Sequence, residues 1–317
     1  MPLMSSEEKR MLVYGPVPSR RLGRSLGLDL VPLKTCTFDC VYCQLGRGTG
    51  TTLKRDSYIP PDAILEAVRE SLAGGADPDY ITLSGSGDPT LHSQLGTIIR
   101  GIKALTGIPL ALITNGSLLW DEEVRHDAVG CDLVLPSLDA GDEETFKKIN
   151  RPDKALSWEK ILEGLIRFRV DFGGPIWLEV MLVAGINDSE QSLQNIKAAI
   201  ERIAPDKIHL NTVARLPAES WAHAVPPAKM EEIRALFGDS AEIIAEYSGR
   251  HSLHSHSPRR DEILGTLRRR PCSADDIAAG LQINRHELVK ELALLESEGL
   301  IIAEEWEGNR FYRPADS

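Results

Sequence analysis

Three of the five cysteines of this chain lie within eight residues, at Cys36, Cys40 and Cys43. Their spacing is C-x3-C-x2-C, and the segment contains neither a fourth cysteine nor a histidine. A structural zinc site needs four ligands, and the two other cysteines, Cys131 and Cys272, stand alone in the sequence. A four-iron cluster can be held by three thiolates, one on each of three irons. The fourth iron then keeps an open position where a ligand can bind and react.

Two simpler interpretations of this segment stay open at the level of spacing. The three thiols can belong to an ordinary loop of a protein from a reducing compartment, or a distant histidine can complete a zinc site. The segment also resembles the signature of the radical S-adenosylmethionine (SAM) superfamily, including the aromatic Tyr42 before the last cysteine. The resemblance implies that Cys36, Cys40 and Cys43 hold one four-iron four-sulfur cluster. It also implies that SAM binds the open iron and that an electron donor such as flavodoxin or ferredoxin drives its cleavage to a 5′-deoxyadenosyl radical.

Composition sets broad limits on the class of protein. With 317 residues, of which 42% are hydrophobic, the chain can form one large domain or two domains with a substantial core. No segment has the roughly 18 uninterrupted apolar residues of a membrane span, and residues 1–10 lack the apolar run of a signal peptide. An odd number of cysteines argues against a disulfide framework, so we expect a cytoplasmic protein without membrane contacts. The formal charge of −11 disfavours nonspecific binding to nucleic acid, although a local basic patch is compatible with it.

Short apolar runs alternate with longer amphipathic stretches from the cysteines to about residue 215, which is the pattern of repeated β-α units. The expected strands cover residues 26–30, 79–84, 109–114, 133–137, 176–183 and 207–213. The expected helices cover residues 62–72, 94–105, 158–168 and 192–203. Six parallel strands are too few for a closed eight-stranded barrel, so we predict an α/β fold with a partial (β/α)6 TIM-like barrel. The cores of radical SAM enzymes are six-stranded partial barrels, so the resemblance implies the same fold.

Functional groups of such barrels gather at the carboxyl ends of the strands. The loop Ser84-Gly85-Ser86-Gly87-Asp88-Pro89-Thr90 corresponds in order to the glycine-rich loop that receives the amino group of SAM, although many members have Gly-Gly-Glu-Pro there. Through the same resemblance Ser137 is expected to hold the ribose or carboxylate of SAM, and Leu182 to Asp188 to flank the adenine. The expected cofactor-binding residues are Tyr42, Gly85, Ser86, Gly87, Asp88, Thr114, Asn115, Ser137, Asp139, Val183, Asn187 and Arg215. Singly, Thr114, Ser137 and Asn187 can equally be helix caps or Asx turns.

Further segments are similar to a prokaryotic group of radical SAM proteins related to the wyosine tRNA-modifying enzymes. They are residues 14–27 before the cysteines, Ile149-Asn150-Arg151-Pro152 after the fourth strand, and residues 211–219 after the sixth. Arginines at loops suit bidentate binding of carboxylate or phosphate, so we predict that Arg20, Arg21, Lys34 and Arg151 contact substrate. The alternative for each is a surface ion pair with an acidic residue. A tRNA substrate further predicts a basic path across the barrel mouth that includes Arg20, Arg21, Arg24, Lys34, Arg47 and Lys54.

The last 60 residues have the pattern of a separate module. Amphipathic segments at 259–267, 273–280 and 284–300 precede a hairpin at 301–312, which predicts a winged helix-turn-helix layout. Such a layout can place its third helix in a DNA groove, but from Arg259 onward nine Lys/Arg stand against twelve Asp/Glu. A module that docks a protein or presents substrate is therefore favoured. The three histidines of 251–256 are expected to be part of a polar linker rather than a metal site.

We therefore expect four parts. They are an N-terminal extension with the first strand (1–35), a radical SAM core (36–217), a connecting segment (218–257) and a winged-helix-like domain (258–317). Three functions remain open: radical modification of a tRNA or nucleobase, radical modification of a peptide, protein or small metabolite docked by the C-terminal domain, and a non-catalytic iron–sulfur redox regulator that binds DNA.

Overall fold

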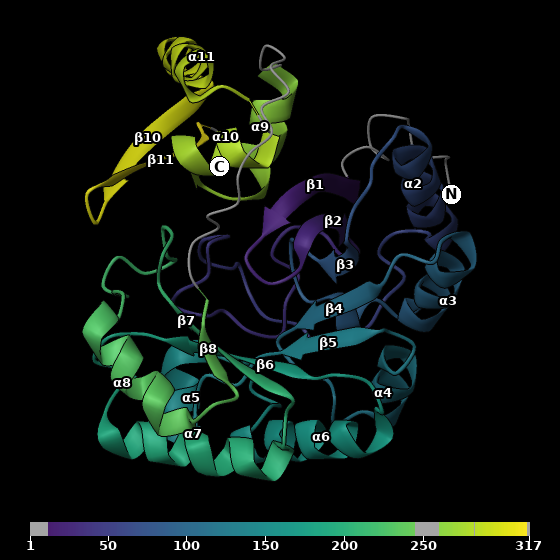
Figure 1. The fold of residues 1–317 in the computed structure, drawn as a ribbon, viewed down its shortest axis with the longest axis vertical. Helices are drawn as coiled ribbons and strands as arrows, with labels where there is room; N and C mark the ends of the chain where they lie inside the picture. The colour runs from purple at the N-terminus through teal and green to yellow at the C-terminus, as the bar shows by residue number, and fades with distance from the viewer. Residues whose placement is uncertain (1–11, 245–259, 282, 316–317) are drawn as a thin grey trace.

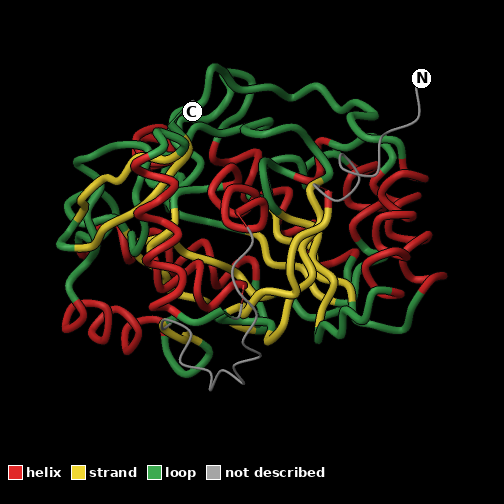
Figure 2. The backbone as a smooth tube through the Cα atoms, turned by 90° about the horizontal axis from the view of Figure 1, so that it is seen from above, coloured by secondary structure: helices red, strands yellow, loops and turns green. Residues whose placement is uncertain are grey.

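The computed structural model describes residues 12–244, 260–281 and 283–315, and the histidines of 251–256 lie outside them. Figure 1 shows an α/β body with a smaller C-terminal module above it, next to strands β1 and β2. In Figure 2 the strands of the body form a central layer with helices at its sides. The described residues contain no helix long and apolar enough to cross a membrane.

The body is built on seven parallel strands in sequence order. These are β2 (Gly23–Asp29), β3 (Tyr80–Ser84), β4 (Leu110–Thr114), β5 (Leu133–Pro136), β6 (Trp177–Leu182), β7 (Lys207–Thr212) and β8 (Ala241–Ile243). Parallel bridges from Val134 to Ile176 and from Ser137 to Glu179 join β5 to β6 and make the sheet continuous. The antiparallel strand β1 (Val13–Ser19) adds to the other side of β2. The prediction of a partial parallel barrel is confirmed, and its six expected strands are β2 to β7.

Helices cover the outer face of this sheet, as Figure 1 shows for the pair α6 and α7. They are α2 (Pro61–Ala73), α3 (Leu95–Leu105), α4 (Glu122–Ala128), α5 (Glu143–Asn150), α6 (Trp158–Asp171), α7 (Glu190–Ile203) and α8 (Pro227–Phe237), with the 3-10 turn η1 (Pro89–Leu91). Local sequence sets several starts: α2 has proline in its first turn, and Ser157 and Ser189 accept hydrogen bonds from the third residue of α6 and α7. Alternate residues of β6, such as Leu178 and Val180, are buried in the core beneath these helices.

Helix α8 and strand β8 lie within residues 218–257, which the sequence analysis treats as a connection. Strand β8 pairs with β7 over Ile208–Ala241 and Leu210–Ile243, so this segment extends the sheet. Its three strand residues carry too little apolar periodicity to be recognised from sequence. The boundaries of the four parts remain a proposal.

Inside the barrel, polar side chains meet near the middle of strands β6 and β7. Arg21, from the turn between β1 and β2, forms an ion pair with Glu179 of β6. The partner of Glu179 across the register is His209 of β7, which is 2% exposed. Burial, with a smaller contribution from Arg21, lowers the pKa of His209 to about 4. His209 is therefore neutral in the folded protein at neutral pH.

This histidine predicts how stability depends on pH. The unfolded chain binds the proton near pH 6.5, whereas the folded chain binds it only near pH 4, so the folded state loses stability as the pH falls through that window. Between pH 7 and pH 4.5 we expect His209 to account for about 2 to 3 kcal/mol of the fall in unfolding free energy. Urea unfolding of wild type and His209→Gln at both pH values measures this contribution. Equal losses in the two proteins would show that His209 is not its source.

The C-terminal module contains the element order that the sequence predicts. It comprises α9 (Arg260–Arg269), β9 (Cys272–Ser273), α10 (Ala274–Leu281), α11 (Arg285–Ser297), β10 (Ile301–Trp306) and β11 (Asn309–Pro314). The hairpin turns at Glu307 and Gly308, both with positive φ, and β11 also pairs with β9. Ile263, Ile277, Leu288 and Leu292 are fully buried in a separate core. Assignment to the winged-helix class remains a proposal.

Candidate active site

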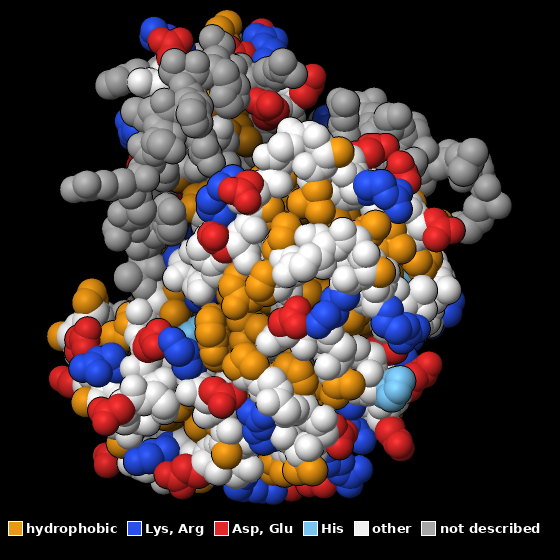
Figure 3. All heavy atoms as spheres, turned by 45° about the vertical axis from the view of Figure 1, so that its right-hand side comes forward, with side chains coloured by type: hydrophobic (Ala, Val, Ile, Leu, Met, Phe, Trp, Pro, Cys, Tyr) orange, Lys and Arg blue, Asp and Glu red, His pale blue; other side chains and the backbone are white. Residues whose placement is uncertain are grey.

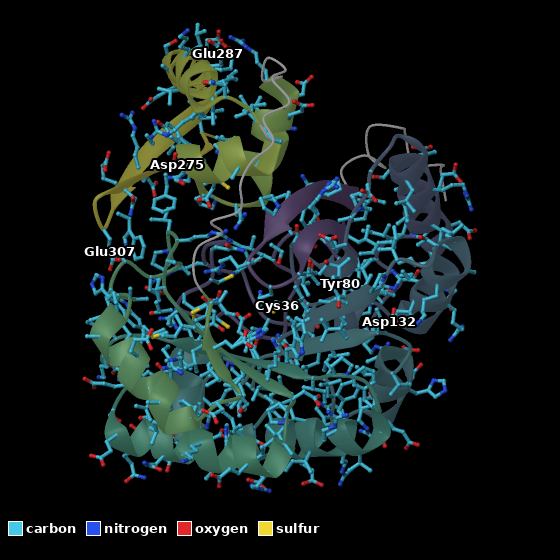
Figure 4. All side chains as sticks on the ribbon, in the orientation of Figure 1. Cys36, Tyr80, Asp132, Asp275, Glu287 and Glu307 are labelled. Carbon is cyan, nitrogen blue, oxygen red and sulfur yellow. The ribbon has the colours of Figure 1, made fainter. Side chains whose placement is uncertain are left out.

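The cysteine loop follows the carboxyl end of β2, where the loops after β3, β4 and β5 also begin. Figure 4 shows Cys36 near the centre of the molecule, between the strands of the body and the C-terminal module. The thiols of Cys36, Cys40 and Cys43 are all half-buried and unpaired by disulfides. The charge of each affects the others, so the three sulfurs share one neighbourhood.

Each of these thiols has a nitrogen donor beside it. Asn115 Nδ2 lies 3.3 Å from Cys36 Sγ, and Asn150 Nδ2 lies 3.4 Å from Cys40 Sγ. The Lys34 ammonium pairs with Asp39 at 3.4 Å and lies near Cys43; burial opposes its charge, but Cys43 and Asp39 raise its pKa above the usual value. Donors to sulfur stabilise the thiolate form and tune the clusters that thiolates hold. The surroundings of the three sulfurs therefore fit a thiolate-bound iron–sulfur cluster.

Without a metal the thiols of Cys36 and Cys40 are protonated. Burial raises the pKa of Cys36 to about 12 and that of Cys40 well above its usual range. Among the described residues, no three histidine, cysteine, aspartate or glutamate side chains are placed to ligate a single metal ion. A cluster takes one thiolate on each of three irons and does not need the sulfurs to converge on one ion. Loading it releases the thiol protons, because the cationic irons stabilise the thiolates.

The carboxyl end of α5 holds the cysteine loop through main-chain hydrogen bonds. The amide of Val41 donates to Ile149 O at 2.9 Å, and the amide of Asp39 donates to Asn150 O at 3.0 Å. Arg151 ends the helix with φ 45°, and its guanidinium pairs with Glu219. The Ile149-Asn150-Arg151-Pro152 segment thus accepts hydrogen bonds from the backbone of the cysteine loop, and the Asn150 side chain donates to the Cys40 sulfur.

The glycine-rich loop after β3 packs directly against the cysteine loop. A Cβ on Gly87 would lie 2.1 Å from the carbonyl oxygen of Thr35, which no side chain can accommodate. Gly85 has φ 111°, and the amide of Ser86 donates to Asp29 Oδ1 at 2.6 Å. The backbone amide of Lys34 in turn donates to Ser86 O. Glycine at 85 and 87 is therefore needed for the close approach of the two loops.

Asp88 is 2% exposed and all its acceptor capacity is used inside the protein. Its carboxylate accepts hydrogen bonds from the Thr90 amide at 2.9 Å, the Thr114 hydroxyl at 2.8 Å and the Asn115 amide at 2.7 Å. Asn115 then reaches Cys36 and the Thr37 hydroxyl, the latter at 2.8 Å. Asp88 and Thr114, both expected to contact SAM, thus position the loop that carries Asn115.

A second buried carboxylate, Asp139, organises the other side of the site. It accepts hydrogen bonds from the Tyr42 hydroxyl at 2.5 Å, Asn150 Nδ2 at 2.7 Å and the Met181 amide at 2.9 Å. Burial raises its pKa above the usual value. Asn187, fully buried, donates to the carbonyl oxygens of Asp139 and Met181. The hydrogen bonds of Asp139 and Asn187 thus join Tyr42 of the cysteine loop to β5 and β6.

Ser137 is the expected SAM residue whose side chain is left for a ligand. It is half-buried, and its hydroxyl has no hydrogen-bond partner among the described side chains and backbone. A small cavity beside it is lined by Phe38 of the cysteine loop and by Asn115, Asp139 and Asn150. Val183 is fully buried and bridges to Ala224. The cavity brings together three of the residues that the sequence assigns to SAM.

Three of the six residues of the predicted basic path do not lie at the mouth. Arg20 and Arg21 lie in the turn before Gly23, and Arg24 is the second residue of β2. All three are therefore at the end of the sheet opposite the cysteine loop. Arg21 reaches inward to Glu179, and Arg24 pairs with Asp77. The sequence could not show this, because it depends on the direction in which β2 runs through the barrel.

The remaining predicted cations of the path and of substrate binding are paired with carboxylates. Lys34 pairs with Asp39, and Lys54 pairs with Asp56. Arg47 and Arg151 both pair with Glu219, a buried residue whose pKa they lower. The amide of Glu219 donates to Val41 O at 3.0 Å, so this glutamate also holds the cysteine loop. Glu219 ends the 211–219 segment but was not among the predicted site residues. Figure 3 shows one face on which acidic and basic side chains intermix around a band of hydrophobic ones.

The C-terminal module contacts the body at the same mouth, which no sequence motif indicates. Arg269 lies 3.3 Å from Asp29 Oδ2 and over the ring of Tyr14, and Arg270 donates to Gln44 Oε1 at 3.2 Å. Arg215, after β7, donates to the same oxygen at 3.0 Å. The residue that follows the third cysteine of the loop is thus in contact with the module.

The chain is thus a partial parallel barrel with three unpaired thiols in the loop at the carboxyl end of its first parallel strand. A family model described as the radical SAM superfamily matches residues 30–201, which is more than half of the chain. The chain therefore belongs to the radical SAM superfamily. It is an enzyme of that superfamily, and its cofactors are a four-iron four-sulfur cluster and SAM.

The relatives differ in how much of their own length this chain covers. A UPF0026 protein of Methanocaldococcus jannaschii is 34% identical over 322 residues, covering 95% of both chains. A protein of Brachyspira hyodysenteriae named GTPase Obg is 38% identical over 299 residues, but the chain spans only 44% of that protein. A probable GTP 3′,8-cyclase of Saccharolobus islandicus is 31% identical over 193 residues, covering 60% of this chain and 58% of that one.

Solved structures share the fold at lower identity. TYW1 with a lysine-pyruvate adduct bound is 19% identical with a TM-score of 0.51, covering 72% of this chain and 76% of that chain. A radical SAM methyltransferase from Sphaerobacter thermophilus is 14% identical with a TM-score of 0.54, covering 69% and 66%.

Proposed function

We propose that Cys36, Cys40 and Cys43 hold the cluster and that the chain modifies the nucleobase of a nucleotide or tRNA. The observation that carries the first part is that Asn115 and Asn150 donate to the sulfurs of Cys36 and Cys40, while the Lys34 ammonium lies near Cys43. When bound, the reduced cluster and SAM supply a 5′-deoxyadenosyl radical, which abstracts a hydrogen atom from substrate. The physiological reductant is proposed to be a flavodoxin or ferredoxin.

The protein's own residues then have three tasks. Gly85, Ser86 and Gly87 bring main chain next to the cysteine loop, where it can receive the amino group of SAM. Ser137 offers its free hydroxyl to SAM from the end of β5. Asp88 and Asp139 act indirectly, because both are buried and hold Asn115, Tyr42 and Asn150 in place. Burial of these two carboxylates also excludes water, which would otherwise weaken their hydrogen bonds.

The substrate class is argued from the mouth and from one relative. The similarity to a probable GTP 3′,8-cyclase supports a nucleotide, because that protein's name specifies a guanine nucleotide. Two guanidinium groups, of Arg215 and Arg270, contact Gln44 directly after Cys43 in a chain of net charge −11. Cations at this place suit the phosphate of a nucleotide or RNA.

The test is a comparison of substrates on the cluster-loaded protein. With dithionite and SAM, unfractionated tRNA or GTP is expected to increase release of 5′-deoxyadenosine above the rate without substrate. A matched mixture of acidic and neutral peptides is expected to leave that rate unchanged. Stimulation by peptides and not by tRNA or GTP would reject the nucleotide assignment.

The position of the C-terminal module favours a second candidate, radical modification of a peptide or protein that this module docks. Trp306 of β10 packs against the main core, and Glu307 lies 3.2 Å from His223 of the body. A partner bound to the module would therefore lie near the mouth. The same comparison of substrates separates the two candidates. The third one, a non-catalytic regulator, is set aside because the chain is an enzyme.

A further inference from the structure

Two arginines from different parts of the chain converge on one neutral oxygen. Arg215 Nη1 lies 3.0 Å from Gln44 Oε1, and Arg270 Nη1 lies 3.2 Å from the same atom. Gln44 directly follows Cys43, Arg215 follows β7, and Arg270 follows α9 of the C-terminal module. The side chain of Arg215 is 30% exposed, and Arg270 is half-buried. Both charges are therefore partly removed from water.

The protein balances the charge at this point only in part. An amide oxygen accepts hydrogen bonds but carries no net charge, so it does not neutralise two guanidinium groups. Arg215 forms an ion pair with Asp276, whose Oδ1 is 3.6 Å from Arg215 Nη2 and whose other oxygen accepts from Ser273. Within the described ranges Arg270 forms no ion pair, and the adjacent Arg269 is already paired with Asp29. Like charges in partly buried surroundings repel, and an anion between them would relieve this repulsion.

We propose that Arg215 and Arg270 bind a phosphate group of the substrate beside the cysteine loop. The guanidinium fork matches phosphate oxygens in geometry as well as in charge. The site rests on the proposed function for its substrate class, and it makes the C-terminal module part of the active site. The carboxylate of SAM is the other anionic group expected nearby, and separate measurements distinguish the two.

Binding of inorganic pyrophosphate to the full-length, iron-free chain tests the site by isothermal titration calorimetry. Arg270→Gln is expected to weaken binding at least tenfold, because one of two charge-assisted contacts is lost. Arg268→Gln is the matched control, since Arg268 is exposed on α9 two residues away and changes charge equally. It is expected to change affinity less than twofold. Equal affinity in wild type and both variants, or equal weakening in both variants, would overturn the site.

A second variant covers the case in which Arg270→Gln loosens the module. Gln44→Glu places a carboxylate between the two arginines and keeps both contacts, so the module stays docked. It is expected to abolish pyrophosphate binding while the thermal unfolding midpoint stays equal or rises. Retained binding of pyrophosphate in Gln44→Glu would contradict the proposal.

SAM affinity separates the two anions and also separates this inference from the function on which it rests. In cluster-loaded protein, Arg270→Gln is expected to bind SAM within twofold of wild type. Weakened SAM binding with unchanged pyrophosphate binding would assign the arginines to SAM and overturn the proposal. Pyrophosphate binding that depends on Arg270 in a protein that cleaves no SAM would count against the proposed function and leave the anion site intact.

Discussion

Replacement of Cys40 by alanine is expected to remove the cluster and to reduce 5′-deoxyadenosine release by more than the roughly 100-fold that loss of an outer-shell partner costs. Three protein ligands leave no spare thiolate, because Cys131 and Cys272 are buried elsewhere in the structure. The same result is expected for Cys36→Ala and Cys43→Ala. Iron and sulfide content after anaerobic reconstitution measures the loss.

Cys131→Ala is the control for this prediction. Cys131 is buried in the main core, where burial raises the pKa of its thiol, and it has no part in the cysteine loop. The substitution leaves a small cavity and costs on the order of 1 kcal/mol. Iron content is expected to equal that of wild type. Full iron content in any of the three loop variants would mean that the cluster has a different ligand set.

Replacement of Asp139 by alanine is expected to lower the free energy of unfolding by about 3 to 5 kcal/mol. Its carboxylate accepts from Tyr42, Asn150 and Met181 at 2.5, 2.7 and 2.9 Å, and it is 3% exposed. Removal leaves three buried donors without an acceptor, each costing roughly 1 to 3 kcal/mol. Because Asn150 also contacts Cys40, iron retention is expected to fall about 10- to 100-fold as well. Urea unfolding and iron analysis measure the two effects.

Asp121→Ala provides a matched loss of an aspartate that accepts a backbone hydrogen bond. Asp121 caps α4 through the Glu123 amide at 2.9 Å, away from the cysteine loop. Its replacement is expected to cost about 1 kcal/mol and to leave iron retention unchanged. If Asp139→Ala and Asp121→Ala had the same effect on both measurements, Asp139 would make only an ordinary local contact and would not hold the site together.

The site was most predictable where its residues are close together in sequence or follow strands. The cysteine spacing and the strand-end loops put Asn115, Ser137 and Asp139 around one cavity, since parallel strands bring their carboxyl ends together. Roles within the site were less predictable. Asp88 and Asn187 have residue types that suit ligand contacts, but their depth of burial turns them to internal hydrogen bonds. Burial follows from tertiary packing, which the sequence pattern does not specify.

Contacts between distant elements could not be predicted at all. The meeting of Gln44, Arg215 and Arg270 depends on how the C-terminal module packs on the body, and none of the three stands in a motif that indicates it. Arg21 was predicted to contact substrate because a loop arginine in the segment before the cysteines suits bidentate binding of carboxylate or phosphate. The seven residues of β2 lie between them and carry the chain across the sheet, so Arg21 is near the opposite end and pairs with Glu179.

The most direct test of the account is reductive cleavage of SAM by the wild-type protein. After anaerobic reconstitution to full iron and sulfide content, the protein is given dithionite and SAM, and 5′-deoxyadenosine is measured by liquid chromatography. We predict its release by wild type and none above background from the Cys36, Cys40 and Cys43 variants. Wild-type protein that carries a complete cluster and yet releases no 5′-deoxyadenosine, with or without tRNA or GTP, would contradict the account.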